Sequence, residues 1–388
     1  MDQALKIPRS EFLDRIARFQ ARIQAAGLDA CLVHGNESDM ANVRYLTEQW
    51  PTFEAAAVFV PAVGTPVLIT GPESGKYGLG RNALPTVKSM LTYREMAEPD
   101  YPGMKLDTYA DVVKAAMGDR PLKKLGICSW AITPLPVWFA LKEQLPDVEI
   151  VKADETLLPL RYVKSANELA CMREAFRVAE AAVDAILGEI KPGMTEFQVI
   201  GIAQREIYKN GGEYEGHALY CFCGERTNNA ICRPSHNTLK EHQLIQLNIG
   251  ARVDGYSSSI GIPLSFGALP AEQEKLVKFG LEAHLHSIAQ TGVGKNVGEL
   301  VRAYEQWVRD QGYGDYLVYG PFHSIGMMEV ERPWMESTSE YTLEANMTFQ
   351  ADTFFSGKDF GLRWEKGIII RPDGTEVLGS KYNQPVVL

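Results

Sequence analysis

Strand-like segments in the C-terminal half of the sequence carry a histidine and two carboxylates that could do acid–base chemistry. His323 stands in residues 320–326 (GPFHSIG), and Asp352 and Glu365 end two later segments, MTFQAD and LRWE. An imidazole changes charge near neutral pH, and a carboxylate can orient it or exchange a proton with it. These residue types suit either proton transfer or the binding of a metal ion.

Two other groups of residues have weaker claims to chemistry. Cys221, Cys223 and Cys232 could suggest zinc, but the spacing lacks a CxxC pair, and strand alternation places Cys221 and Cys223 on one face. Packing explains these cysteines more simply than a metal ligand or a reactive thiol does. The glycine-rich residues 292–298 lack the Lys-Ser/Thr pair of a phosphate-binding loop, so nucleotide binding is not expected.

The strand-like segments are set among long amphipathic helices. Ser165 and Glu168 have the spacing of a capping box, and the apolar residues that follow repeat with the helical period. Thr195 begins a second such helix, and residues 292–299 precede a third that ends at Gly312. The second and third segments share a glycine, a polar cap, a glutamate and a helix. This repeat predicts two similar halves packed face to face, with the site in the seam between them.

The N-terminal part of the sequence alternates helices with short strands. Residues 8–26 have apolar residues at the helical period and stop at a glycine. Further helix-like stretches alternate with β-rich runs at residues 30–33, 57–60, 66–69, 124–127 and 149–151. The alternation predicts an α/β domain. A turn between Asp154 and Pro159 marks its end, so we expect an N-terminal domain of residues 1–158 and a C-terminal domain of residues 159–388.

Residues 160–168 (LRYVKSANE) resemble the lead-in to the catalytic domain of the creatinase/prolidase/aminopeptidase P superfamily. Four later segments follow in the order of that superfamily, at residues 246–259, 320–326, 347–352 and 362–365. Because five segments match in order and at similar spacing, the chain is identified as a member of this superfamily. The resemblance implies an α/β N-terminal domain and an α+β, pita-bread C-terminal domain with pseudo-twofold halves.

The resemblance also shows which residues this sequence lacks. In metal-dependent members the matching segments supply two Asp, one His and two Glu to a pair of divalent ions. Carried over position by position, these residues are Asn248, Ser259, His323, Asp352 and Glu365. An amide and a hydroxyl are weak, neutral ligands that do not replace two carboxylates. We therefore expect no catalytic metal and no cofactor, the alternative being a single ion held by His323, Asp352 and Glu365.

Without a metal, the resemblance implies acid–base chemistry. His323, Asp352 and Glu365 are the predicted catalytic residues, and Asn248 and Ser259 are predicted to hydrogen-bond the substrate or a developing oxyanion. Buried carboxylates need a proton or a positive partner, so we expect a cationic substrate. The pattern is similar to the metal-deficient branch that includes creatinase and ectoine hydrolase.

Three departures separate the sequence from its better-known relatives. Ile231 stands where the family places a histidine, seventeen residues before the first ligand position, and Ile262 stands where creatinase has an acidic residue. Val330 stands where peptidases have a second histidine. The first two departures argue against creatinase, and the third leaves the role of that histidine in peptide cleavage unfilled.

Three further residues are predicted to bind substrate. Arg226 could bind a substrate carboxylate or form a loop salt bridge. Either Glu331 or Glu329 could reach the pocket, and otherwise both are surface charges. Trp334 could stack on a cationic head group, because aromatic faces attract cations, or it could belong to the core.

These residues predict a metal-independent hydrolase that cleaves a C–N bond in a small nitrogen compound of the amidine, guanidino or cyclic amide type. One alternative is a single-metal enzyme, either a lyase or an enzyme similar to an Xaa-Pro dipeptidase. The other alternative is a non-catalytic binding protein that keeps a peptidase fold. Loss of function on replacement of His323 would separate the hydrolase from the binding protein.

Composition and charge narrow the partners. The 388 residues carry a net charge of −10, which argues against nucleic acid or an anionic membrane, because both need clustered Lys and Arg. The first ten residues do not resemble a signal peptide, and the longest apolar run, residues 55–63, is far shorter than the roughly 20 residues of a membrane span. Six scattered cysteines indicate reduced thiols. We therefore expect a cytoplasmic protein with a small-molecule substrate.

The resemblance implies one further partner, a second copy of the chain. Members of this branch with an N-terminal domain form homodimers in which one protomer contributes to the pocket of the other. On that arrangement residues 36–50, which include Tyr45 and Trp50, would shape specificity from the partner chain.

Overall fold

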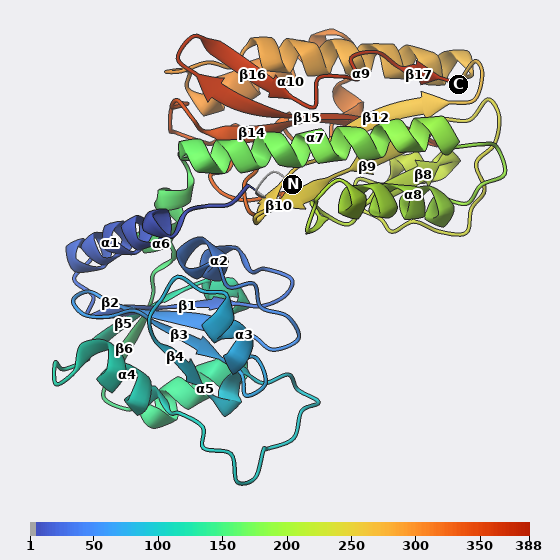
Figure 1. The fold of residues 1–388 in the computed structure, drawn as a ribbon. Helices are drawn as coiled ribbons and strands as arrows, with labels where there is room; N and C mark the ends of the chain where they lie inside the picture. Colours follow the sequence, from blue (N-terminus) through green and yellow to red (C-terminus); the bar gives the residue numbers. More distant parts are fainter. Residues whose placement is uncertain (1–4) are drawn as a thin grey trace. The chain divides into compact units, whose positions relative to one another are not determined.

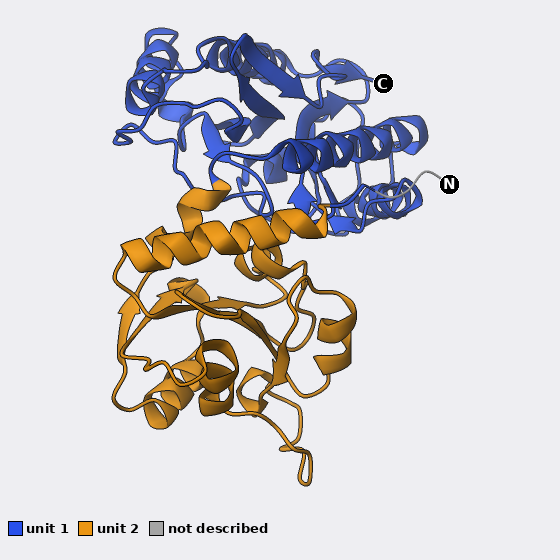
Figure 2. Ribbon diagram, turned by 60° about the vertical axis from the view of Figure 1, so that its left-hand side comes forward, with its two compact units in different colours: residues 1–6, 162–388 blue, residues 7–161 orange. Residues whose placement is uncertain are grey.

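A computed structural model describes residues 5–388 of the chain. The chain divides into two compact units, shown in different colours in Figure 2. One unit comprises Ile7–Arg161, and the other comprises residues 162–388 together with the described residues before Ile7. The sequence placed the division three residues earlier, in a segment that forms the short helix α6 (Asp154–Leu157) and a turn of 3-10 helix (Leu158–Arg161).

The unit of residues 7–161 is a mixed sheet with helices, as the alternating pattern predicted. Helix α1 (Arg9–Ala25) buries Phe12, Ile16, Phe19 and Ile23, the residues at helical spacing. Six strands follow in the spatial order β4-β3-β2-β1-β5-β6. Their bounds are β1 (Ala30–Gly35), β2 (Ala56–Pro61), β3 (Val67–Thr70), β4 (Val87–Ser89), β5 (Lys124–Cys128) and β6 (Glu149–Lys152). Only β4 escaped the sequence pattern, since it is three half-buried residues long.

Four short helices complete this unit. They are α2 (Ala41–Thr47), α3 (Gly75–Gly80), α4 (Tyr109–Met117) and α5 (Leu135–Gln144). Helix α4 begins at Thr108, whose side chain forms a capping box with Asp111. One apolar core joins the sheet to α4 and α5 and includes Phe59, Ile69 and Leu141.

The C-terminal unit is built on an eight-stranded sheet with the path β13-β14-β15-β12-β9-β8 (Figure 1). The strands are β8 (Tyr220–Cys223), β9 (Ile245–Ile249), β12 (Ile260–Ser265), β13 (Phe322–Ser324), β14 (Thr348–Ser356) and β15 (Gly361–Arg371). Strand β16 (Gly374–Leu378) pairs with β15, and β17 (Val386–Val387) pairs with β12. A separate small sheet consists of β7 (Tyr214–Glu215), β10 (Ala251–Val253) and β11 (Tyr256–Ser257).

Two pairs of helices pack on this sheet, one from each half of the unit. Helix α7 (Ala166–Glu189) pairs with α8 (Glu196–Lys209) and contacts β9 and β12, whereas α9 (Ala271–Ala289) pairs with α10 (Val297–Asp310) and contacts β14 and β15. The pairs are green and orange in Figure 1. This arrangement agrees with the predicted repeat and with the pita-bread fold of two similar halves.

The helices begin where the polar caps of the sequence placed them. Ser165 and Thr195 each accept a hydrogen bond from the residue three positions later, and each forms a complete capping box. Asn296 caps α10 through the backbone N–H of Glu299. Because these side chains satisfy otherwise unpaired N–H groups, they fix the first turn of each helix.

One glycine shows how tightly α7 lies on the sheet. A Cβ atom at Gly367 of β15 would lie 2.3 Å from the ring of Phe176 on α7. Only a residue without a side chain allows this ring to reach the strand, so Gly367 sets the distance between helix and sheet at this point.

Two findings bear on the expected absence of a membrane span and on the expected reduced thiols. Among residues 5–388, none of the helices combines the length and apolar character needed to cross a membrane. All six cysteines are free thiols, and five of them are buried.

The capping boxes predict a measurable effect on stability. Replacing Ser165 with Ala should lower the free energy of unfolding by about 1 kcal/mol, because the N–H of Glu168 loses its acceptor at the start of α7. Urea denaturation of wild type and variant would measure the difference. Leu13→Ala, an exposed change on α1, is the control and should shift the midpoint little. No change with Ser165→Ala would contradict a stabilising cap.

Candidate active site

The site is built on one row of residues that runs across the sheet. In the strand register Tyr220 lies opposite Asn248, Asn248 opposite Gly261, Gly261 opposite Glu365, and Glu365 opposite Asp352. Neighbours in such a row share one face of the sheet. The row therefore brings together three of the sequence-predicted site residues that stand far apart in the chain.

Gly261 in the middle of the row lets its neighbours meet. A Cβ atom at this position would lie 2.7 Å from Cβ of Glu365 and 2.9 Å from the amide nitrogen of Asn248. Since real Cβ atoms do not approach other atoms so closely, a side chain here would push the two residues apart. Gly261 thus opens the space through which Asn248 reaches Glu365 across strand β12.

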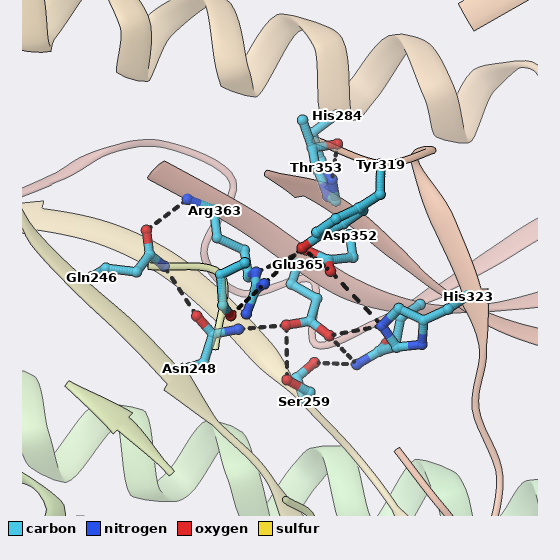
Figure 3. A network of polar contacts seen from close by, with 12 residues as sticks. Gln246, Asn248, Ser259, His284, Tyr319, His323, Asp352, Thr353, Arg363 and Glu365 are labelled. Atoms are coloured by element: carbon cyan, nitrogen blue, oxygen red, sulfur yellow. Dashed lines mark hydrogen bonds and ion pairs between the residues drawn. The ribbon is translucent and has the colours of Figure 1, made fainter. Parts of the chain in front are cut away.

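The carboxyl group of Glu365 is buried and held by three neutral side chains (Figure 3). Asn248 donates its amide N–H to Oε2, and Ser259 Oγ lies 2.9 Å from the same oxygen. Gln350, on β14, donates from Nε2 to Oε1 at 3.0 Å. All four residues are at most 2% exposed. None of the three neighbours brings a positive charge, so the cage satisfies hydrogen bonds without neutralising an anion.

Asp352 is in a different environment, because it forms an ion pair. Arg363 Nε lies 3.0 Å from Oδ1 of Asp352, and both side chains are at most 10% exposed. Tyr319 donates to Oδ2 of Asp352 at 2.8 Å and accepts from Arg363 at 2.6 Å. Strand alternation explains the contact, since Arg363 and Glu365 are two residues apart on β15 and face the same side.

His323 faces a group of three carboxyl side chains. Its Nε2 lies 3.3 Å from Oε1 of Glu329, 3.7 Å from Oε1 of Glu365 and 3.9 Å from Oδ2 of Asp352. Figure 3 shows the imidazole directed at Glu365 and Asp352. The structure therefore brings together the three predicted catalytic residues and adds Glu329 to them.

Burial and mutual repulsion favour the protonated forms of two of these carboxyl groups. Burial, followed by the charges of Asp352 and Glu329, raises the pKa of Glu365 well above its ordinary value. Burial likewise raises the pKa of Glu329 to about 7, where Asp352 adds to the effect and Arg363 opposes it. Near neutral pH the site thus holds exchangeable protons on carboxyl groups beside an imidazole, which is an arrangement for acid–base chemistry.

A second histidine, His217, lies just before β8 and reaches the same group. Its Nε2 lies 3.0 Å from Oγ of Ser259, and its Nδ1 lies 2.7 Å from the carbonyl oxygen of Ala218. Burial lowers the pKa of His217 to about 4, so the imidazole is neutral at physiological pH.

These side chains open onto a cavity of about 430 Å³. Its polar lining includes His217, Tyr319, His323, Glu329, Glu336, Asp352, Arg363 and Glu365. Its apolar lining includes Tyr220, Ile231, Phe322, Val330, Trp334 and Met335. A volume of this size suits a small molecule, and polar groups gathered on an otherwise apolar wall are typical of a binding site.

Only some of the predicted substrate-binding residues line the cavity. Trp334 lines the cavity and is 45% exposed, and the guanidinium of Arg332 lies over its ring at 5.8 Å from the centroid. Asn248 and Ser259 are not among the lining residues, because the hydrogen bonds to Glu365 hold them beneath the surface. They are thus placed to orient the carboxyl group and not to touch a ligand in the cavity.

Arg226 and Glu331 are engaged in ion pairs away from the cavity lining. Arg226 pairs with the buried Glu196 at 3.2 Å, which corresponds to the loop salt bridge left open by the sequence. Glu331 pairs with Lys164 at 3.0 Å, and both side chains are at most 6% exposed. Of the two glutamates after β13, the one that reaches the cavity is Glu329.

The residues present do not fit a two-metal centre. Asn248 and Ser259 occupy two of the five ligand positions, are neutral, and direct hydrogen-bond donors at Glu365 where a cation would need lone pairs. Asp352 is already paired with Arg363. Among the described residues, the set with metal-ligand spacing is His323, Glu329 and Glu365, whose ligand atoms lie within 4.8 Å of one another. That set suits at most one ion.

Three residues of the site, Gln350, Arg363 and His217, were not predicted from the sequence, although the first two could have been. Gln350 and Arg363 each stand two positions before a predicted catalytic carboxylate, so strand alternation would have placed them on the same face. His217 gave no such signal, because it lies outside a strand and meets Ser259 from 42 positions away.

Comparisons with known proteins match both units. Residues 170–372 match metallopeptidase family M24, and residues 15–163 match the creatinase/prolidase N-terminal domain. A putative dipeptidase from Bacillus subtilis is 23% identical over 384 residues, which cover 97% of this chain and all of that protein. An Xaa-Pro dipeptidase from Pyrococcus horikoshii is 25% identical over 321 residues, which cover 82% of this chain and 87% of that protein.

Solved structures show the same fold. An Xaa-Pro dipeptidase from Bacillus anthracis has a TM-score of 0.81 at 22% identity, covering 97% of this chain and 100% of that one. An X-Pro aminopeptidase from Thermotoga maritima has a TM-score of 0.82 at 20% identity, covering 96% and 99%. The two-unit architecture is therefore shared with peptidases of this type.

The row across the sheet predicts the effect of one small substitution. Gly261→Ala should lower any activity of the site by about 100-fold or more, because the added methyl group separates Asn248 from Glu365. Gly201→Ala is the matched control, since a Cβ atom there meets nothing within 4 Å. Activity of Gly261→Ala equal to that of the control would show that the contact between Asn248 and Glu365 is unimportant.

Because Glu331 forms a buried ion pair with Lys164, replacing Glu331 should reduce the stability of the fold and not the binding of a ligand. Glu331→Ala should lower the free energy of unfolding by about 3–5 kcal/mol, because Lys164 is left buried without its partner. Removing both charges with Lys164→Met and Glu331→Leu should restore part of the loss. Thermal denaturation measures both variants, and an unchanged melting temperature for Glu331→Ala would contradict this role.

Proposed function

Because the chain belongs to metallopeptidase family M24, we propose that it is a hydrolase that has kept the family's fold but cleaves a C–N bond without a metal ion. The observation that carries the proposal is the use of two former ligand positions. Asn248 and Ser259 both contact Oε2 of Glu365, so these positions now hold a carboxyl group in place of a cation.

The charges around the cavity support a cationic substrate. Four carboxyl groups line it, those of Glu329, Glu336, Asp352 and Glu365, and Arg363 is the one lysine or arginine among the described lining residues. Since Arg363 is paired with Asp352, a positive head group would be drawn to the exposed Glu336, and its charge would favour the ionised forms of Glu329 and Glu365. Trp334 at the same cavity offers an aromatic face to such a head group.

The arrangement supplies both halves of an acid–base hydrolysis. His323 accepts a proton from water as the water oxygen bonds to the carbon of the substrate, and a protonated Glu329 gives its proton to the nitrogen that leaves. Arg363 lines the cavity, and its guanidinium suits negative charge that develops on the substrate. Amidines and guanidino compounds meet these requirements of size and charge, and so does a cyclic amide that carries a positive group elsewhere.

A second candidate is a single-metal peptidase of the Xaa-Pro dipeptidase type. It is favoured by the convergence of His323, Glu329 and Glu365 and by the names of the relatives. It differs from the first candidate in requiring an ion for activity. A non-catalytic binding protein is the third candidate, and it requires neither the ion nor the proton chemistry of His323.

Replacement of His323 tests the proposed chemistry. A screen of small cationic amidines, guanidino compounds, cyclic amides and Xaa-Pro dipeptides should identify a hydrolysed substrate, and His323→Ala should lower kcat for it by about 100- to 10,000-fold. His236→Ala is the control, because His236 is exposed and does not line the cavity, and it should retain full activity. Unchanged hydrolysis by His323→Ala would contradict the proposal.

A further inference from the structure

Three exposed apolar side chains, called here the apolar wall, line the cavity of the candidate active site. They are Ile231, Val330 and Trp334, which are 84%, 49% and 45% exposed. The carboxyl-bearing Asp352 and Glu365, which line the same cavity, are at most 5% exposed. The cavity therefore has acidic groups at its buried end and apolar side chains where it opens to solvent.

The backbone on both sides of Ile231 is anchored to other parts of the C-terminal unit. The carbonyl oxygen of Ala230 accepts a hydrogen bond from Nη2 of Arg363 at 3.0 Å. On the other side, Arg226 donates a hydrogen bond to the carbonyl oxygen of Arg233. These contacts hold the segment in place while the side chain of Ile231 stays almost fully exposed, so packing in the core does not account for an apolar residue here.

Val330 and Trp334 belong to the loop that follows β13, and this loop is anchored as well. The backbone N–H of Glu331, next to Val330, donates to the carbonyl oxygen of Ser324 at 3.0 Å. The hydroxyl group of Ser324 in turn donates to the carbonyl oxygen of Pro333 at 2.7 Å, directly before Trp334. Both apolar side chains are therefore held at defined places beside the cavity.

The apolar wall favours a ligand that has an apolar part. Removing apolar surface from water lowers the free energy roughly in proportion to the area, so each methylene group that covers the wall strengthens binding. Single exposed apolar side chains are ordinary, but three that line one cavity together with polar groups are typical of a binding site. The guanidinium of Arg332 already lies 5.8 Å from the centroid of the Trp334 ring, so the aliphatic Ile231 and Val330 give the cleaner test of the wall.

We propose that the apolar wall is a specificity subsite and that the substrate is an amphipathic cation, with a positively charged nitrogen head and an apolar chain of several carbons. The head and the reaction rest on the function proposed above, and the chain is the new element. The exposed carboxyl group of Glu336, which lines the same cavity, complements the head. Ile231 and Val330 stand where the resemblance places histidines, so the apolar wall is particular to this chain.

A series of n-alkylammonium ions tests the subsite without any reaction, because these ions carry the charged head and lack a bond that hydrolysis could cleave. Isothermal titration calorimetry of the full chain should show Kd falling about two- to fourfold for each methylene added between ethylammonium and hexylammonium. Hexanoate, with a chain of similar length and the opposite charge, should bind about tenfold more weakly than hexylammonium. Equal Kd values along the series would overturn the subsite, and equal binding of hexanoate would overturn its preference for cations.

Two valines provide a matched variant and control. Val330 and Val293 are 49% and 50% exposed, and Val330 is the one of the two that lines the cavity. Val330→Ser and Ile231→Ser should each raise the Kd of hexylammonium about five- to tenfold and leave that of ethylammonium within about twofold, because the short chain does not cover the wall. Val293→Ser should bind both ions as wild type does. Full affinity in both cavity variants, or an equal loss in Val293→Ser, would overturn the subsite.

A second copy of the chain is the other occupant that would cover this apolar surface, and light scattering separates it from a ligand. Ile231→Ser should leave the mass of the particle in solution unchanged. A changed mass together with an unchanged Kd for hexylammonium would overturn the subsite and identify a contact between chains. Failure of the proposed function appears instead as absence of hydrolysis while binding still depends on chain length, so the two failures are distinguishable.

Discussion

Glu365 is a carboxyl group buried in the middle of a sheet, and the other features of the site follow from how that group is satisfied. Burying a carboxylate without a positive partner costs several kcal/mol, and a protein avoids this cost by protonating the group or by pairing it. Here the nearest side chains are an amide, a hydroxyl and a second amide, which donate hydrogen bonds and carry no charge. The carboxyl group is therefore held in place without being forced to ionise.

The neighbouring Asp352 shows the opposite solution. It sits directly across from Glu365 in the strand register, but it faces the guanidinium of Arg363. Two carboxyl groups in adjacent positions thus have different partners, since neutral side chains hold Glu365 whereas a guanidinium pairs with Asp352. His323 lies beside both groups and beside Glu329, so the imidazole has three carboxyl groups within 3.9 Å.

This arrangement is consistent with the proposal that a member of a metallopeptidase family uses side chains, without a metal ion, for catalysis. The fold delivers the same strands to the same place as in its relatives, since the architecture depends on helix caps, glycine contacts and strand pairing that are separate from the ligand positions. On the proposed function, Asn248 and Ser259, which stand at two positions where the resemblance places acidic ligands, hold a carboxyl group in place of a cation. Function resides in the site and not in the fold.

The sequence predicted the elements and the central residues well, for physical reasons. Capping boxes at Ser165 and Thr195 and the helical spacing of apolar residues are local signals, and the structure confirms both helices. The position of His323 beside Asp352 and Glu365 came from ordered segments on neighbouring strands.

Residues whose position depends on tertiary geometry were harder to predict. The choice between Glu329 and Glu331 depends on the path of the loop after β13, where Glu331 turns to Lys164. The importance of Gly261 depends on how β9, β12 and β15 are aligned with one another. The spacing of residues within one strand does not determine that register. His217 could be found only from the fold, because it reaches Ser259 from outside the strands of the row.

The proposed hydrolysis needs no metal ion, and metal content measured together with activity tests this property. Protein purified without added metal would be analysed by inductively coupled plasma mass spectrometry, and hydrolysis of a screened substrate would be followed before and after treatment with a chelator. We expect about zero equivalents of divalent metal per chain and unchanged activity after chelation. One or more tightly bound ions per chain, with activity lost on chelation and restored by the metal, would contradict it.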